Sequence, residues 1–210
     1  MKIILGTIIA SVLLAGQAQA LVKGNFDKPT SAPAATVYGP TLPPAGYVDF
    51  CGRDEDECKF KDGKVERMEL TSDKWAEINK VNHYVNTKIR PATDMELYGV
   101  ADYWTYPVDA GDCEDYVLLK KRYFEQLGYN ADQLLITVVL DENGEGHAIL
   151  TIPTDQGDIV LDNRRQEIVR WNETGYIFLK RQSQAQSNLW VSLQKGPAQT
   201  VNLSTSTKPN

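Results

Sequence analysis

The stretch GDCEDYVLLKKRYFEQLG, residues 111–128, decides how the rest of the chain can be arranged. It predicts a helix from Asp112 to Gly128, because its apolar side chains recur on one face at helical spacing. That face carries Cys113, Val117, Phe124 and Leu127. Gly128 suits the position just past a helix C-terminus. The chain therefore places a single thiol, that of Cys113, in the first turn of this helix.

A second helix is predicted upstream, from Thr71 to Arg90. Its apolar residues also recur at three- and four-residue steps: Trp75, Ile78, Val81, Val85 and Ile89. Thr71 or Ser72 can cap its start, and Pro91 ends it. His83 lies off this apolar stripe, so we expect it at the surface or at the rim of a site rather than in the chemistry.

Downstream of the thiol helix, apolar runs bounded by turn residues predict strands. The runs are residues 134–140, 147–152, 158–161, 175–180 and 189–193. Turn clusters at residues 142–146 and 154–157 separate the first three. Helices followed by a run of strands predict an α+β fold, with a thiol-bearing helix packed against an antiparallel β-sheet.

The first twenty residues predict a cleaved signal peptide. Lys2 precedes an apolar run from Ile3 to Ala15, and Ala18-Gln19-Ala20 is a small-x-small cleavage signal. The apolar run is short for a membrane span, although an uncleaved anchor remains an alternative. We therefore expect a mature protein that begins near Leu21 and works outside the cytoplasm.

The remainder predicts one folded domain, residues 50–195, with an extension at each end. Residues 21–49 contain Pro29, Pro33, Pro40, Pro43 and Pro44 and predict an extended arm. Residues 196–210 are polar and small without periodicity, which predicts a disordered tail. The net charge of -6 argues against a nucleic-acid partner and against binding to an anionic membrane surface.

Three cysteines raise the question of pairing. Cys51 and Cys58 lie close in sequence within an acidic loop, so a disulfide between them is the economical arrangement and leaves Cys113 free. A zinc site is disfavoured because it needs four ligands and the chain has only two histidines. A free cysteine in an exported protein is either an inert buried thiol or a reactive one.

The position of Cys113 favours reactivity. Unpaired N–H groups and the positive end of the helix dipole stabilise a thiolate in the first turn, and the same N–H groups can donate to an oxyanion. Gly111 would let a substrate backbone approach closely. Cys113 is therefore a candidate nucleophile.

A base and its orienting carboxylate are predicted on the hairpin that follows. His147 begins one strand and Asp162 follows the returning strand, so that residue numbers summing to about 309 face each other. The two side chains then share one face as opposite or diagonal neighbours, unless the register slips by one residue. Each residue alone has a structural alternative, but together with Cys113 they match the logic of a catalytic triad.

The motifs that carry these residues resemble a known family. Asp102-Tyr103-Trp104, the run from Gly111 to Tyr116, Gly146 to Leu150, and Leu161-Asp162-Asn163 are similar to segments of the bacterial transglutaminase-like cysteine peptidases, and most of all to the LapG-type periplasmic proteases. The resemblance spans roughly residues 50–176. It implies a papain/transglutaminase-like core with Cys113 as nucleophile, His147 as base and Asp162 as third member.

The resemblance also implies a biological role. Members of the LapG type are calcium-dependent proteases of the periplasm that cleave the N-terminal region of large surface adhesins and so release biofilm cells. An inner-membrane receptor that senses cyclic di-GMP holds them inactive. These properties are expectations from the resemblance alone.

Three acids around the thiol need an explanation. Asp112, Glu114 and Asp115 disfavour a thiolate at Cys113 because like charges raise its pKa. They could simply favour the helix N-terminus. Alternatively they bind Ca²⁺, which takes carboxylate oxygens and adds positive charge beside the thiol, with further ligands from elsewhere. We expect these three residues to be calcium ligands.

Two other functions fit the same residues. The same triad can transfer the acyl group to an amine, as a transglutaminase does, because only the acceptor differs. A non-catalytic calcium-binding module for a membrane receptor is the third alternative. Its interface anchors would come from four tryptophans that are otherwise expected in the core: Trp75, Trp104, Trp171 and Trp190.

Overall fold

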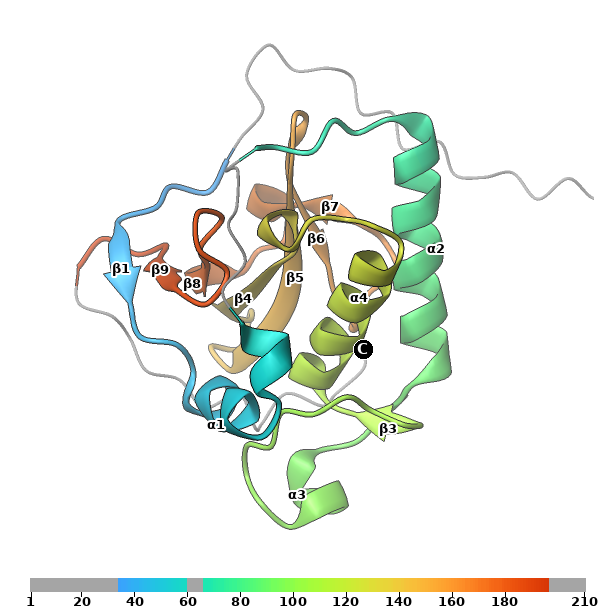
Figure 1. Ribbon diagram of the computed structural model, residues 1–210, viewed down its shortest axis with the longest axis vertical. Coiled ribbons are helices and arrows are strands. Elements are labelled where there is room, and N and C mark those ends of the chain that lie inside the picture. The colour runs from blue at the N-terminus through green and yellow to red at the C-terminus, as the bar shows by residue number, and fades with distance from the viewer. Residues whose placement is uncertain (1–33, 60–65, 197–210) are drawn as a thin grey trace, which may run out of the picture.

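A computed structural model describes residues 34–59 and 66–196 (Figure 1). The predicted signal peptide, residues 1–20, lies outside the described residues, as do residues 21–33 of the predicted arm and the tail from residue 197. No helix within the two described ranges is both long and apolar enough to cross a membrane.

An antiparallel sheet forms the centre of the fold. Across the described residues its strand order is β1-β9-β8-β4-β5-β6-β7. The strands are β1 (Gly39–Thr41), β4 (Leu135–Leu140), β5 (Gly146–Thr154), β6 (Gly157–Leu161), β7 (Val169–Arg170), β8 (Ile177–Gln182) and β9 (Trp190–Ser192). The five longer downstream strands β4, β5, β6, β8 and β9 correspond to the five predicted apolar runs, which confirms the α+β prediction.

The described residues also form helices. They are α1 (Ala45–Arg53), α2 (Ser72–Lys88), α3 (Asp94–Tyr98) and α4 (Cys113–Gln126), with short 3₁₀ turns η1 (Glu55–Cys58), η2 (Ala131–Gln133) and η3 (Trp171–Glu173). Helix α4 packs against β5, and α2 packs against α4 on its outer side (Figure 1). The thiol helix is therefore the layer between the sheet and α2.

Helix α2 begins where its cap predicts and ends earlier than expected. The Thr71 side chain accepts a hydrogen bond from the backbone N–H of Lys74, so Thr71 is the N-cap. The helix stops at Lys88 rather than Arg90, because Ile89 is extended and Arg90–Pro91 form strand β2. Strand β2 pairs in parallel with β3 (Ala110–Gly111), which leads directly into α4.

The predicted arm of residues 21–49 ends earlier than the proline pattern suggested. Residues 39–41 form β1 at the sheet edge, and α1 already begins at Ala45, directly after the last proline of the arm. Helix α1 buries Tyr47 and Phe50 in the core. Cys51 near its end forms the expected disulfide with Cys58 of η1. An apolar face of only two side chains was too weak a pattern to reveal so short a helix.

The main core lies between the sheet and the helices. Its fully buried large side chains include Trp104, Trp190, Phe124 and Ile78. A smaller apolar cluster contains Ile149, Val160, Tyr176 and Phe178. Of the four tryptophans, Trp104 and Trp190 are fully buried and Trp75 and Trp171 partly so, which agrees with the core interpretation and leaves little tryptophan surface for a partner.

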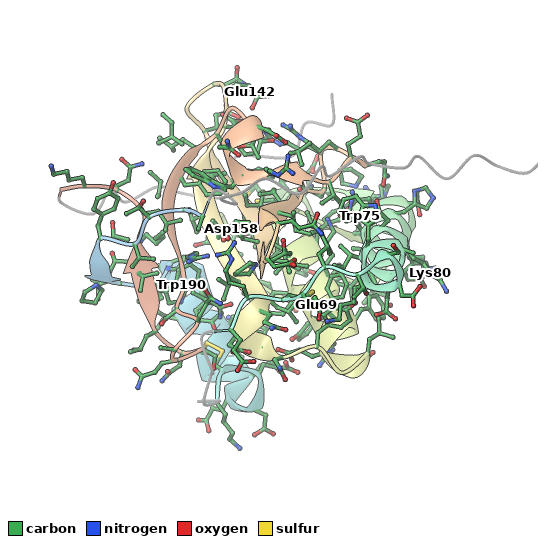
Figure 2. All side chains as sticks on the ribbon, turned by 90° about the horizontal axis from the view of Figure 1, so that it is seen from above. Glu69, Trp75, Lys80, Glu142, Asp158 and Trp190 are labelled. Carbon is green, nitrogen blue, oxygen red and sulfur yellow. A yellow bond between two sulfur atoms is a disulfide. The ribbon has the colours of Figure 1, made fainter. Side chains whose placement is uncertain are left out.

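A buried carboxylate joins the N-terminal segment to the sheet. The Asp158 side chain in β6 is 0% exposed; Arg67 donates to it at 2.5 Å, and Arg181 of β8 lies 3.6 Å away. The N–H of Ala35 donates to the same carboxylate at 3.0 Å. Figure 2 shows Asp158 well inside the molecule, whereas Glu142 lies at its rim.

We predict that Asp158→Ala destabilises the fold by about 3 kcal/mol, because removal of one partner leaves a buried guanidinium without its counter-charge. Thermal or urea denaturation of the mature protein measures the loss. Asp56→Ala, which removes the exposed ion pair with Lys59, is the control and should leave the midpoint unchanged. Equal midpoints for the Asp158 variant and the parent would contradict the structural role given to this residue.

Candidate active site

The thiol of Cys113 lies at the junction of helix α4 and strand β5. Cys113 is the first residue of α4 and is 0% exposed. Its Sγ accepts a hydrogen bond from the backbone N–H of Ala148 at 3.3 Å, and the thiol donates to the Glu114 carboxylate at 3.0 Å. Since Ala148 is the chain neighbour of His147, the predicted nucleophile lies at the strand residue next to the predicted base.

The strand pair β2–β3 sets the entry to α4. Pro91 pairs with Gly111, and the N–H of Ala92 donates to the Gly111 carbonyl at 3.0 Å. A Cβ at Gly111 would lie 2.5 Å from an Asp115 carboxylate oxygen. A close neighbour that requires glycine here is therefore Asp115 of the chain itself. The approach of a substrate backbone to Gly111 stays a prediction.

His147 and Asp162 meet as predicted, although in a slightly different register. The β5–β6 hairpin turns through residues 155 and 156, so that paired residue numbers sum to 311 rather than 309. Continued by one residue, this register makes His147 the diagonal neighbour of Asp162 on one face. The His147 Nε2 lies 2.9 Å from Asp162 Oδ1, and both side chains are fully buried.

This contact decides which imidazole nitrogen can act as a base. Burial alone would raise the pKa of Asp162, but His147 and the bound N–H and O–H groups lower that pKa well below its usual range. Asp162 is therefore an anion that accepts a hydrogen bond from Nε2–H. With Nε2 protonated, Nδ1 of a neutral imidazole carries the lone pair and is the nitrogen able to take a proton from a thiol.

The immediate surroundings of the thiol oppose its ionisation. Burial raises the pKa of Cys113 well above its usual value, and the charges of Glu114 and Asp112 raise it further. The Ala148 N–H acts in the opposite direction. In the absence of a positive charge nearby, the thiol form therefore predominates at neutral pH.

Three carboxylates gather beside the thiol. One oxygen each of Asp94, Asp112 and Glu114 lie within 4.8 Å of one another, and all three residues are buried. Asp112 occupies the N-cap position of α4 but makes no capping hydrogen bond through its side chain, so capping does not explain it. Asp115 lies close by and binds the Thr105 N–H through Oδ1 at 2.9 Å.

The cluster carries more negative charge than its surroundings neutralise. Burial, and then the repulsion between these acids, raises the pKa of Asp112 to about 7 and that of Glu114 well above its usual value. Burial likewise raises the pKa of Asp94 to about 6 and that of Asp115 to about 9. Either protons or a cation must compensate these groups.

The donor set suits a hard cation. Buried carboxylate oxygens without a hydrogen-bond partner remain on all four acids: Asp94 Oδ1, both oxygens of Asp112, Glu114 Oε1 and Asp115 Oδ2. Clustered carboxylate oxygens are what Ca²⁺ binds, at six to eight ligands in all. The residues present therefore fit a calcium ion. The specific ligand set of Asp112, Glu114 and Asp115 stays a prediction.

Asp94 is the acid of this cluster that the sequence did not reveal. It begins α3 in an excursion between β2 and β3, and the parallel pairing of those two strands returns the chain to Asp112. In the local sequence Thr93-Asp94-Met95-Glu96, the side chains of Thr93 and Glu96 form a capping box at the start of α3. Acids in this first turn therefore have a local explanation that needs no binding site. Only the tertiary pairing shows the role of Asp94.

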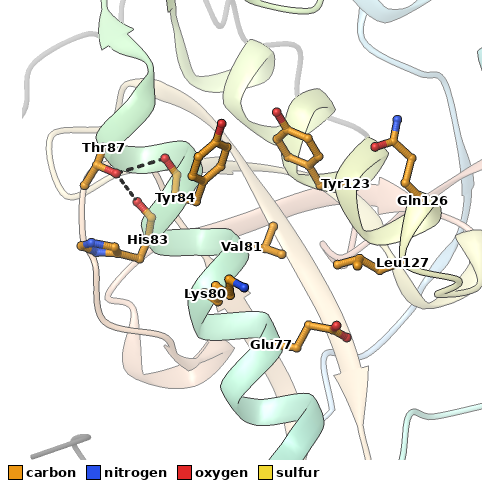
Figure 3. Close-up of a pocket in the computed structure, with 9 residues that line it drawn as sticks. All are labelled: Glu77, Lys80, Val81, His83, Tyr84, Thr87, Tyr123, Gln126 and Leu127. Carbon is orange, nitrogen blue, oxygen red and sulfur yellow. Dashed lines mark hydrogen bonds between the residues drawn. The ribbon is translucent and has the colours of Figure 1, made fainter. Parts of the chain in front are cut away.

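His83 lies where the sequence predicted, on the surface. It is exposed on α2 and lines a cavity of about 520 Å³ between α2 and α4, together with Tyr84, Tyr123 and Leu127 (Figure 3). Neither Cys113, His147, Asp162 nor any of the clustered acids lines this cavity. The second histidine is therefore no part of the candidate site.

Known proteins resemble this chain over most of the folded domain. A family model described as bacterial transglutaminase-like cysteine proteinase matches residues 37–198. Calcium-bound Legionella pneumophila LapG is 23% identical, over 60% of this chain and 74% of that one, with a TM-score of 0.49. The EGTA-treated form of that protein is 26% identical, over 51% and 62% of the chains, with a TM-score of 0.45. No curated protein matches the chain.

We predict that His147→Ala slows alkylation of Cys113 by iodoacetamide at neutral pH about 10-fold or more, because the thiol loses its proton acceptor. Mass spectrometry of the labelled protein over time gives the rate constant. His83→Ala is the matched control, since it removes the other histidine at an exposed position, and its rate should equal that of the parent. A His147 variant that alkylates at the parental rate would exclude a thiol–imidazole pair.

Proposed function

Because the chain belongs to the family of bacterial transglutaminase-like cysteine proteinases, we propose that it is a calcium-dependent endopeptidase that cleaves the N-terminal region of a large surface adhesin. The family makes it a cysteine peptidase. The observation that carries the chemistry is the thiol of Cys113 bound to the N–H beside His147, whose Nε2 is bound to Asp162.

In the acylation step, His147 and Cys113 act on the substrate while Asp162 stays bound to the imidazole. His147 Nδ1 takes the thiol proton, and Cys113 Sγ forms a bond to the scissile carbonyl carbon, whose oxygen becomes an oxyanion. The first-turn N–H groups of α4, not capped by the Asp112 side chain, can donate to that oxyanion. His147 then gives its proton to the leaving amine as the carbon–nitrogen bond breaks, which leaves a thioester on Cys113.

Deacylation repeats the proton transfers with water. His147 takes a proton from a water molecule as its oxygen attacks the thioester carbon, and returns the proton to the sulfur when the carbon–sulfur bond breaks. Throughout both halves, Asp162 accepts from Nε2–H and stabilises the imidazolium that forms. The products are a new carboxylate, a new amine and the restored thiol.

Asp94, Asp112 and Glu114 would hold the calcium ion, with Asp115 as a fourth acid beside them. Bound there, the ion supplies positive charge next to the thiol and lowers the pKa of Cys113. This offsets the repulsion that these acids otherwise exert on a thiolate. Solved structures of Legionella LapG in calcium-bound and EGTA-treated forms support a search for the same ion in this chain.

Location and regulation form part of the proposal. The N-terminal pattern of residues 1–20 supports export to the periplasm, where a surface adhesin and the periplasmic domain of an inner-membrane cyclic di-GMP receptor are both accessible. The resemblance of the Cys113, His147 and Asp162 motifs to LapG-type proteases supports these partners. The affinity of the receptor for the chain would then set the fraction of peptidase that is free to cleave the adhesin.

Incubation of the mature protein with the N-terminal segment of a large adhesin encoded in the same genome tests the proposal. With Ca²⁺ we expect a single cleavage with free new termini; with excess chelator, or with Cys113→Ser or His147→Ala, we expect none. Mass spectrometry of the products separates hydrolysis from transfer to an amine, which would instead leave isopeptide links. Full activity in chelator, with removal of metal confirmed, would refute the calcium dependence.

We also predict that Asp94→Asn lowers the affinity for Ca²⁺ about 10-fold or more, because affinity in oxygen sites follows the number of charged ligands. Isothermal titration calorimetry measures it without any substrate. The Asn side chain keeps an oxygen to accept from the Tyr103 N–H, so the local fold is preserved. Asp73→Asn, an exposed acid in the first turn of α2, is the control. Equal affinity of the Asp94 variant and the parent would remove Asp94 from the site.

A further inference from the structure

The second oxygen of Asp162 is held by a residue to which the chemistry above gives no role. The Tyr176 hydroxyl donates to Asp162 Oδ2 at 2.8 Å. Tyr176 comes just before β8 and is 9% exposed. Its hydroxyl oxygen in turn accepts a hydrogen bond from Arg165 Nη2 at 2.9 Å. Arginine, tyrosine, aspartate and histidine therefore form one hydrogen-bonded chain that ends at the base.

The two oxygens of this carboxylate have separate partners. Oδ1 binds His147 Nε2 and the backbone N–H of Arg164, each at 2.9 Å. Oδ2 binds the Tyr176 hydroxyl and lies 3.5 Å from Arg165 Nε. Because a donor occupies each side, the carboxylate cannot rotate about its χ2 bond without loss of hydrogen bonds to both sets of partners.

The Tyr176 ring also contacts the imidazole itself. The two ring centroids are 5.7 Å apart with an interplanar angle of 83°, an edge-to-face arrangement. The Arg165 guanidinium lies 5.1 Å from the centroid of the Tyr176 ring. Tyr176 therefore limits the tilt of His147 through its ring, and the rotation of Asp162 through its hydroxyl.

The tyrosine remains a donor across the working pH range. Burial raises the pKa of Tyr176 well above its usual value, and the charge of Asp162 raises it further, so the hydroxyl keeps its proton. A neutral hydroxyl that donates to a buried anion makes a charge-assisted hydrogen bond, which is roughly twice as strong as one between neutral groups.

The backbone of this region is fixed independently of Tyr176. Asn86 of α2 donates to the carbonyl of Asp162 at 2.7 Å and to that of Arg165 at 3.2 Å. Removal of the Tyr176 hydroxyl alone thus leaves the loop attached to α2 and changes only what holds the carboxylate. This separation makes the role of the hydroxyl testable.

We propose that Tyr176, supported by Arg165, is a positioning residue that fixes the Asp162 carboxylate and through it the tautomer and orientation of His147. It acts on the thiol only through Asp162 and His147. Without the hydroxyl, the carboxylate is free to turn toward Arg165, which lies close to the same oxygen. The inference rests on the thiol–imidazole chemistry of the peptidase and is independent of the adhesin and of calcium.

A double-mutant cycle tests this pathway. The rate constant for alkylation of Cys113 by iodoacetamide is measured at pH 7.5 and saturating Ca²⁺ for the parent, Tyr176→Phe, Asp162→Ala and the double variant. We expect Tyr176→Phe to lower the rate about 10-fold in the parent, because a hydrogen bond to a charged group is lost. In the Asp162→Ala background the same change should alter the rate less than about 2-fold, since the acceptor is absent.

A matched control isolates the position from the chemistry of the substitution. Tyr129→Phe removes another hydroxyl–carboxylate hydrogen bond, that of Tyr129 to Glu77 at 2.7 Å. No triad residue takes part in this hydrogen bond. The alkylation rate of this variant should equal that of the parent. A Tyr176→Phe effect of the same size with and without the Asp162 side chain would show a general structural role and overturn the proposal.

A spectroscopic measurement keeps the test decisive if the Asp162 variant fails to fold. The chain has only two histidines, so ¹⁵N-histidine labelling yields two sets of imidazole signals. In Tyr176→Phe, the Nε2–H signal of His147 should change in chemical shift, while the signals of the exposed His83 stay in place. Unchanged His147 signals in the folded variant would contradict the proposal independently of any rate.

Discussion

The hydrogen bond from the Ala148 N–H to the Cys113 sulfur is the contact on which the site depends, because it joins the start of α4 to the start of β5. The short β2–β3 pair sets where α4 begins, and the packing of α4 across β5 sets its direction. The β5–β6 register then brings Asp162 to the neighbouring His147. The pairing of β2 with β3 and the packing of α4 on β5 thus together bring the Cys113 sulfur to Ala148.

Burial has opposite consequences for the acids on the two sides of this contact. Asp162 is ionised despite its burial, because His147, Tyr176 and the Arg164 N–H all donate to it. Asp112 and Glu114 lack such donors for most of their oxygens, and burial raises their pKa values. The same residue type is therefore an orienting anion on one side and a candidate cation ligand on the other, as its surroundings dictate.

Sequence periodicity was sufficient for the elements that hold the triad, because α4 and the strands bury long, regular apolar faces. It placed His147 and Asp162 as opposite or diagonal neighbours, and the two-residue turn at 155 and 156 makes them diagonal. Helix α1 escaped prediction because Tyr47 and Phe50 follow a proline-rich stretch. Asp94 and Tyr176 escaped prediction because the pairing of strands that are distant in sequence brings them to the site. No local sequence pattern indicates that pairing.

The central claim is that Cys113 is a nucleophile activated by His147. Acetylation of the chain by p-nitrophenyl acetate tests it most directly, since this small ester needs no specific substrate recognition. Acid-quenched mass spectrometry after the first turnover should find one acetyl group on Cys113 as a thioester, and His147→Ala should prevent its rapid formation. Acetylation confined to other residues, or a thioester that forms equally fast without the imidazole, would contradict the account.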